Sequence, residues 1–265
     1  MPENLGYVVF SLFSQAATGM VLYMFFAYSR IESSTRRLQG KIALAMLGVS
    51  GLVFIWHATG WTMAADSGNA PRSAWIYRQI FCLLLVGTLL AAWVIFRSRL
   101  LMALSAIAGL ILIFIMTKAS LPTAGGLQKG YAALSVSAAD VLLLGPLSLF
   151  FISCLKNRND AAGVSRQILS WQPMAVCLAF VLRMLVTVIQ SLTLENPSSL
   201  TVKLVSTHAA ILLLGAGPLL LLVIRSPLTP VRDETGMFAY NCLLGKVSIM
   251  VGFIWAGEFT GRLAL

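Results

Sequence analysis

Six polar side chains lie inside long apolar stretches of this sequence, where they can hydrogen-bond or exchange protons. They are Gln15, His57, Gln79, Asp140, His208 and Glu258. An ionisable side chain in a lipid-facing segment costs at least a few kcal/mol, so each one needs a partner or a function. With a rise of about 1.5 Å per residue along a helix, all six fall towards the same surface of the protein. We therefore expect them to form one polar layer.

His57 is the residue best suited to chemistry. Trp56 precedes it and Trp61 follows one turn later, which provides an aromatic surface beside the imidazole. An imidazole can hydrogen-bond a ring hydroxyl or carbonyl and can accept a proton, as the oxidation of a quinol requires. His57 and Trp61 are therefore a candidate quinone site. The alternative is a histidine that packs against a neighbouring helix.

The two acidic residues have structural alternatives as well. Asp140 can pair with Lys118 or carry protons outward, and Glu258 stands four residues before Arg262, the spacing of an ion pair within a helix. We expect the Glu258 and Arg262 pair to be structural. Arg183 falls near the middle of its apolar run, where the usual solution is burial beside a carboxylate, an amide or backbone carbonyls.

Known signatures of soluble enzymes are missing from the sequence. It contains no glycine-rich phosphate loop, nucleophile elbow or metal-binding cluster, which argues against a self-contained hydrolase or kinase. The four cysteines occur singly in apolar segments, so we expect them to be packing residues.

The composition identifies the solvent that these residues face. The chain is 58% hydrophobic and 11% charged, whereas a soluble domain carries roughly a quarter charged residues. Runs of roughly twenty apolar residues recur, long enough to cross a bilayer core about 30 Å thick, and backbone in hydrocarbon must be helical or in a closed barrel. The alternation of a barrel strand is absent. We expect an all-α bundle, a single domain of about eight spans near residues 5–29, 41–65, 75–97, 99–118, 134–155, 171–194, 202–224 and 240–262.

Charge in the loops predicts the orientation. The formal net charge is +10, and the odd-numbered loops hold most of the Lys and Arg residues, which marks those loops as cytoplasmic and places both termini outside. This pattern is a topology signal, and we expect no nucleic-acid partner. The first run has no basic residue before it and no small-residue cleavage site after it, so we expect it to stay as the first helix. Only Arg97, Ser98 and Arg99 separate the third and fourth spans, which predicts a tight antiparallel hairpin.

Short motifs along most of the chain resemble one family, the membrane-anchor subunit of dimethyl-sulfoxide reductase type molybdoenzymes. The first span contains a Phe, Gln and Gly pattern, the second ends around a histidine, the fifth contains a Gly-Pro break, and the eighth ends in Gly-Glu and Gly-Arg. The matching residues are Phe10, Gln15, Gly19, His57, Asn69, Gln79, Gly145, Pro146, Gly257, Glu258, Gly261 and Arg262. The family has an acidic residue where Gln79 stands.

The resemblance implies a function that the residues alone do not. It implies an eight-helix subunit of the bacterial inner membrane with periplasmic termini. That subunit oxidises menaquinol in anaerobic respiration and carries no haem. Its partners are an iron-sulfur electron-transfer subunit and a molybdopterin catalytic subunit, which hold the iron-sulfur clusters and the molybdopterin. His57 corresponds to the family's quinol-binding histidine, and we expect Trp61, Gln15, Gln79, Asp140 and Arg78 to assist it.

Two other functions fit part of the same pattern. A cytochrome b could ligate one haem between His57 and His208, which lie at similar depth. A secondary transporter would place polar residues near the midplane on broken helices within inverted repeats. The sequence shows no convincing repeat between its halves, and its polar layer is off-centre.

Overall fold

In a computed structural model, every described segment is built from helices. The structure describes residues 2–64, 70–120, 127–159, 166–193, 206–225 and 234–264. The helices are α1 (Pro2–Phe26), α2 (Ser33–Ala64), α3 (Ala70–Phe96), α4 (Arg99–Ser120), α5 (Leu127–Asn159), α6 (Arg166–Thr193), a π-helical segment η1 (Ile211–Ala216), α8 (Gly217–Arg225) and α9 (Glu234–Ala264). No strand occurs among these residues, so the predicted all-α class is confirmed.

Eight of these helical stretches are long and apolar enough to cross a membrane, as predicted. They are Leu5–Phe26, Ser33–Trp56, Ile76–Phe96, Arg99–Thr117, Leu134–Lys156, Trp171–Ile189, Ser206–Ile224 and Tyr240–Thr260. Several helices extend beyond the predicted spans. Thus α2 begins at Ser33, not near residue 41, and α5 runs from Leu127 to Asn159. An apolar run marks the part of a helix that contacts hydrocarbon, while its polar turns continue into the interface.

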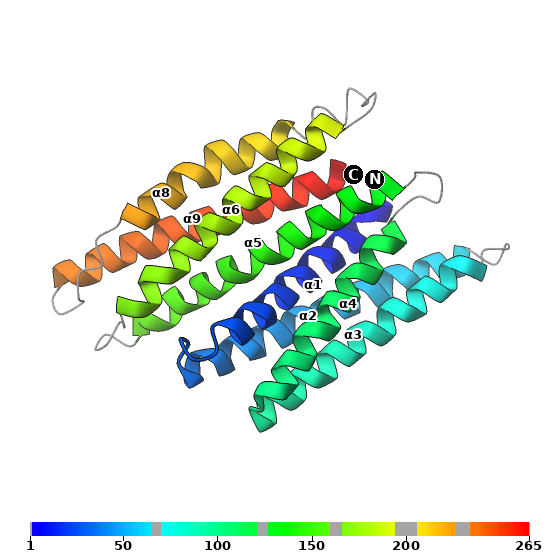
Figure 1. Ribbon diagram of the computed structural model, residues 1–265, viewed down its shortest axis with the longest axis horizontal. Coiled ribbons are helices and arrows are strands. Elements are labelled where there is room, and N and C mark those ends of the chain that lie inside the picture. The colour runs from blue at the N-terminus through cyan, green and yellow to red at the C-terminus, as the bar shows by residue number, and fades with distance from the viewer. Residues whose placement is uncertain are drawn as a thin grey trace.

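The helices form one bundle in which α1 and α5 lie at the centre (Figure 1). Helix α1 contacts α2, α4, α5 and α9, whereas α3 and α4 lie along one edge of the bundle and α6 and α8 along the other. Both termini lie at the same end, which we call the terminal end. The opposite end carries the α1–α2 and α3–α4 links with most of the described loop cations, and we call it the basic end.

Outward-facing side chains show how the bundle meets its surroundings. Leu52, Leu178 and Leu214 are each more than 70% exposed, and many other large apolar side chains share these outer faces. A water-soluble monomer rarely exposes contiguous apolar surface on this scale. The outer faces are therefore the lipid-contacting surface of a multi-pass membrane protein.

The central helices α1 and α5 approach closely through two glycines. A Cβ atom added to Gly19 would lie 2.1 Å from the carbonyl oxygen of Val141, and one added to Gly145 would lie 2.3 Å from the carbonyl carbon of Gly19. Small residues let helix backbones meet in a membrane. The expected Gly-Pro break is wrong, because α5 continues through Pro146. Gly145 instead provides the contact that fixes α5 against α1.

The link between α3 and α4 is as short as predicted. Helix α3 ends at Phe96 and α4 begins at Arg99, and Arg97 between them has a φ of 57°, in the left-handed region. The Arg97 backbone N–H donates to the carbonyl of Trp93 at 2.7 Å. The hydroxyl of Tyr28 donates to the carbonyl of Arg97 at 3.3 Å, which fastens this hairpin to the end of α1.

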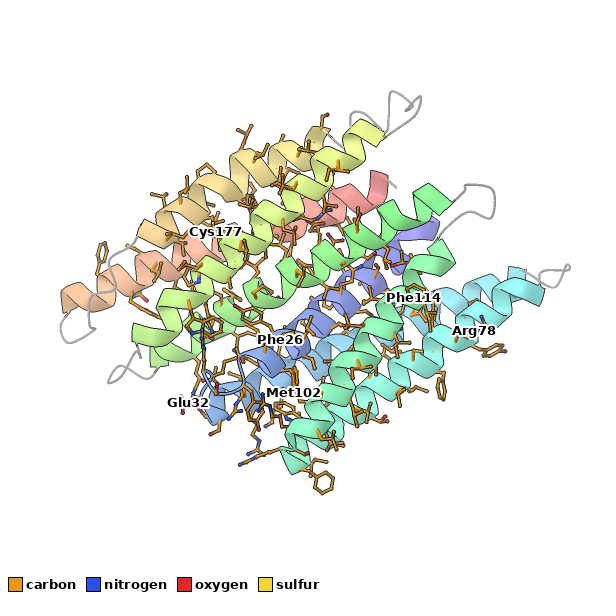
Figure 2. The ribbon with its side chains drawn as sticks, in the orientation of Figure 1. Phe26, Glu32, Arg78, Met102, Phe114 and Cys177 are labelled. Atoms are coloured by element: carbon orange, nitrogen blue, oxygen red, sulfur yellow. The ribbon has the colours of Figure 1, made fainter. Side chains whose placement is uncertain are left out.

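A polar network joins the α1–α2 link to α5 at the basic end. The ammonium of Lys156 donates to Glu32 at 3.2 Å and to the hydroxyl of Thr35 at 2.9 Å, and it contacts the Ser34 hydroxyl as well. Figure 2 shows Glu32 at this end of the bundle. A hydrogen bond from Ser34, followed by the bond to and charge of Lys156, holds the pKa of the Glu32 carboxyl below its usual range.

Replacing Gly19 with Ala should destabilise the bundle, because the added methyl group meets backbone atoms that cannot rotate away. Overpacking of this kind typically costs about 1–3 kcal/mol. Gly48→Ala is the matched control, since nothing lies within 4 Å of a Cβ atom there. The measurement is the midpoint of thermal unfolding in detergent. Equal midpoints for the two variants would contradict the close α1–α5 contact.

Replacing Glu32 with Gln should have a small effect that depends on pH. The pKa of Glu32 is lowered on folding, so its ion pair stabilises the fold above the usual Glu pKa range, and this contribution is lost as the pH falls through the lowered pKa. Because the pair is exposed, we expect a loss below about 1 kcal/mol at neutral pH. Unfolding of both proteins from neutral to acidic pH measures it. A difference that persists at the acidic end would contradict the assignment.

Candidate functional site: a buried ionic cluster

The strongest candidate site is a set of ionisable side chains that meet inside the bundle around Arg183. The guanidinium on α6 makes a two-pronged contact with Glu258 on α9, with Nε donating to Oε1 and Nη2 to Oε2, each at 2.9 Å. Nε also lies 2.6 Å from Oδ1 of Asp140 on α5. The remaining nitrogen, Nη1, donates to the hydroxyl of Thr187, one turn along α6, at 2.9 Å. Three helices are therefore joined at one guanidinium.

His208 completes the cluster, and its partners define its tautomer. Nδ1 lies 2.6 Å from the carbonyl oxygen of Gly257, and Nε2 lies 3.4 Å from Nη2 of Arg183. A carbonyl only accepts and a guanidinium only donates, so Nδ1 carries the hydrogen and Nε2 accepts. The structure therefore places a neutral imidazole against Arg183.

The local backbone brings His208 and Gly257 together. Residues 206–210 are helical and lead into the π-helical segment η1, which packs against α9. A Cβ atom on Gly257 would lie 2.9 Å from Cδ2 of Leu212, so the absence of a side chain allows this approach. Single π-helical turns occur often beside functional sites. Here the turn begins three residues after the histidine that contacts the cluster.

The cluster is fully withdrawn from the surface, which makes its charge balance important. Asp140, Arg183, His208 and Glu258 are each at most 3% exposed. Two ionised carboxylates and one guanidinium carry a net charge of −1 while the imidazole is neutral. One proton bound by a carboxylate or by Nε2 of His208 makes the cluster neutral. It therefore has two states that differ by a single proton.

The predicted polar layer is divided between two parts of the bundle. Asp140, His208 and Glu258 meet, and Gln15 is buried on the central helix α1. Gln79 is buried on α3, which contacts only α2 and α4 among the described helices, so it lies apart from the cluster. Arg78 is exposed on the same helix (Figure 2).

Several predicted residues lie outside the side chains that the structure describes. His57 and Trp61 belong to α2, but the positions of their side chains are not among those described, and the same holds for Lys118 and Arg262. Their predicted contacts stay predictions. Asn69 also lies outside the described residues.

Arg183 is the residue whose importance the sequence understated. Burial beside a carboxylate was one of three expected environments, and it is the one observed, with two carboxylates in place of one. The available signal was its depth. An arginine well inside a span needs a counter-ion at the same depth. Asp140 and Glu258 are acidic residues at that depth on two other spans.

His208 is one of the two histidines that the sequence offers as haem ligands. Both ring nitrogens of His208 have contacts, with Gly257 and Arg183, so neither is directed at an open site. Helix α2, which carries His57, contacts neither η1 nor α8. Across the part of the chain that the structure describes, no group of three His, Cys, Asp or Glu residues is placed to hold a metal ion.

Comparison with protein-family models, with curated proteins and with solved structures finds no match to this chain. The function therefore has to be argued from the site and not from a shared fold.

Replacing Arg183 with Met should destabilise the protein strongly, because it leaves two carboxylates buried without their cation. Loss of one partner from a buried ion pair costs about 3–5 kcal/mol. The triple variant Arg183→Met, Asp140→Asn, Glu258→Gln removes the stranded charges as well and should recover part of that loss. Thermal unfolding in detergent compares the two. A triple variant no more stable than Arg183→Met would contradict the assigned pairing.

Proposed function

We propose that this chain is the membrane-anchor subunit that oxidises menaquinol in a molybdopterin oxidoreductase complex of anaerobic respiration. In this proposal it lies in the bacterial inner membrane with both termini periplasmic. An iron-sulfur subunit and a molybdopterin catalytic subunit bind at the terminal end and receive its electrons. The eight-span bundle and the family motifs in the sequence support the proposal.

The observation that carries the proposal is the buried cluster around Arg183. Oxidation of a quinol to a quinone releases two electrons and two protons, and the protons need acceptors inside the membrane. Asp140, Glu258 and His208 provide such acceptors in the half of the bundle nearer the terminal end. A cluster with two acidic groups and one guanidinium can hold one proton and then release it.

The individual residues have distinct parts in this proposal. His57 hydrogen-bonds one quinol oxygen and accepts its proton, and Trp61 packs on the ring. Gln15 bonds the ring from α1, a helix that contacts both α2, which carries His57, and α5, which carries Asp140. Gln79 and Arg78 on α3 complete the wall of the site or contact the partner subunit. The second proton goes to the cluster through Asp140.

The electrons leave towards the terminal end in this scheme. Each menaquinol gives two electrons to the iron-sulfur subunit, and its two protons leave on the same side. Because the chemistry of the terminal acceptor belongs to the catalytic subunit, this chain needs no metal centre of its own.

A secondary transporter is the second candidate, and one observation favours it. The π-helical segment η1 interrupts the seventh span three residues after His208, which contacts the buried charges. Transporters place interrupted helices and ionisable residues at their binding sites. Purification in mild detergent separates the candidates. Co-purifying chains that contain molybdenum and iron support the anchor subunit, whereas a chain that purifies alone and takes up solute along an ion gradient supports the transporter.

Replacing His57 with Ala in the intact complex should abolish reduction driven by menaquinol, because the ring hydroxyl loses its proton acceptor. Artificial electron donors reach the partner enzyme directly, so their activity should remain. Leu52→Ala is the control, because this side chain of the same helix is 72% exposed towards lipid. The measurement is turnover with each donor. Undiminished menaquinol-driven turnover in the His57 variant would reject the proposed site.

A further inference from the structure

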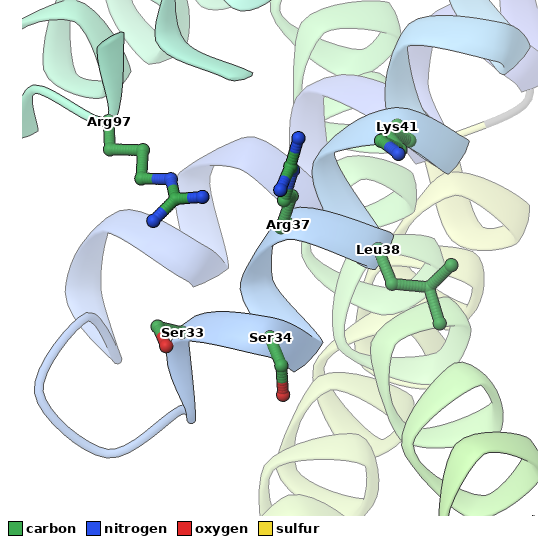
Figure 3. A pocket seen from close by; sticks show the side chains of 6 residues that line it. All are labelled: Ser33, Ser34, Arg37, Leu38, Lys41 and Arg97. Carbon is green, nitrogen blue, oxygen red and sulfur yellow. The ribbon is translucent and has the colours of Figure 1, made fainter. Parts of the chain in front are cut away.

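A second site of a different kind lies at the basic end of the bundle. A cavity of about 420 Å³ opens there between the start of α2 and the link that joins α3 to α4, and it is lined by Ser33, Ser34, Arg37, Leu38, Lys41 and Arg97. Its volume falls within the range of about 300–1,000 Å³ typical of small-molecule pockets. Figure 3 shows Arg97 pointing across the pocket towards Arg37, with Lys41 one turn further along α2.

The lining carries three positive charges without a compensating carboxylate. Arg37, Lys41 and Arg97 make no ion pair with any acidic side chain that the structure describes. The nearby Glu32 is paired with Lys156. Three like charges around one cavity repel one another, and a bound anion would offset that repulsion.

The surrounding cations reinforce the positive potential and do not reduce it. The Arg36 guanidinium lies over the Tyr28 ring at 3.8 Å, and that of Arg99 lies 5.6 Å from the centre of the Phe25 ring. Cation–π contacts hold these side chains in place while leaving their charge uncancelled. The ends of α1, α2 and α4 therefore present a fixed positive surface around the pocket.

The backbone of Arg97 indicates that its position is enforced. Its φ of 57° lies in the left-handed region, which is unfavourable for an L-residue other than glycine. Glycine is the usual residue for such a link. The hydrogen bonds to Trp93 and from Tyr28 fix this conformation, and it directs the Arg97 side chain into the cavity.

The edge of the pocket is apolar on the side that faces lipid. Leu38 lines the cavity itself, and Phe96 and Leu100, beside the α3–α4 link, are 73% and 67% exposed. A ligand that fits this surface combines a negative headgroup with hydrocarbon chains. Basic pockets between transmembrane helices bind anionic headgroups in this way.

We propose that this pocket binds the phosphate of an anionic phospholipid, with Arg37, Lys41 and Arg97 holding the headgroup and the acyl chains lying against the outer face beside Phe96. Occupancy would add an ionic contact between the α3–α4 hairpin and α2, which already pack together at this end where Trp93 of α3 lies against Gly40 of α2. The site is independent of the quinol proposal, because it lies at the opposite end of the bundle from the buried cluster.

Binding is measured on the full chain in nanodiscs, with phosphatidylglycerol titrated into phosphatidylcholine. Removal of one charge should weaken phosphatidylglycerol binding about fivefold, and the double variant Arg37→Gln, Lys41→Gln about 30-fold. Arg30→Gln is the matched control, because it removes the same charge from an exposed residue of the neighbouring link that does not line the pocket. Its affinity should stay within twofold of the unmodified protein, as expected for a surface charge screened by salt.

The variant Arg97→Gly separates lipid binding from folding. It removes a charge from the pocket and also relieves the left-handed backbone, so its unfolding midpoint should be no lower than that of the unmodified protein while binding falls about fivefold. Equal binding of phosphatidylglycerol and phosphatidylcholine, or an equal loss in Arg30→Gln, would overturn the proposal. Saturation of the pocket by inorganic phosphate in phosphatidylcholine discs would show that it binds a free anion and would overturn the assignment to a lipid.

Discussion

The structure depends on one constraint: the bilayer offers no water to a charged side chain, so every ion within it must be compensated by the protein. Arg183 satisfies this constraint through two carboxylates, and in doing so joins α5, α6 and α9. The imidazole of His208 joins the seventh span to the same junction through its contact with Gly257 on α9. Lipid on the outer faces does not fix the helices relative to one another, whereas this internal junction does. That junction lies one residue from Val141, where α5 crosses α1 through Gly19 and Gly145.

The same junction suits proton chemistry because it holds more acidic groups than guanidinium groups. A purely structural pair needs one cation and one anion, whereas this cluster contains two acidic groups, one guanidinium and a neutral imidazole. The additional acidic group makes uptake of one proton possible without exposing the site to water. This property supports the proposed oxidation of a quinol, and it would serve an ion-coupled transporter as well. The two functions differ in what lies beside the cluster. Quinol oxidation requires a redox-active ring and an iron-sulfur partner, whereas transport requires a solute.

Much of the fold could be predicted from the sequence, because hydrocarbon thickness and backbone hydrogen bonding leave few alternatives. The number of spans, the helical class and the tight link at Arg97 all follow from apolar run length and the position of charges. The predicted spans do not include the first turns of α2 or the outer turns at both ends of α5, since polar helical turns outside the hydrocarbon carry no apolar signal. The site was harder to predict. Depth alone grouped Gln79 with Asp140, but depth does not determine which helices are neighbours, and α3 lies at the edge of the bundle. The same limit explains why the contact between Glu258 and Arg183, a cation from another helix, was not predicted.

The most direct test of the central claim is an infrared difference spectrum of the purified complex, recorded as menaquinol is oxidised. If the cluster takes up a proton from the quinol, a carbonyl band of a protonated carboxyl group changes during oxidation, and that change is absent from the Asp140→Asn or the Glu258→Gln variant. A spectrum in which neither variant alters the carboxyl region would show that the cluster keeps its protons throughout and would contradict its part in the reaction.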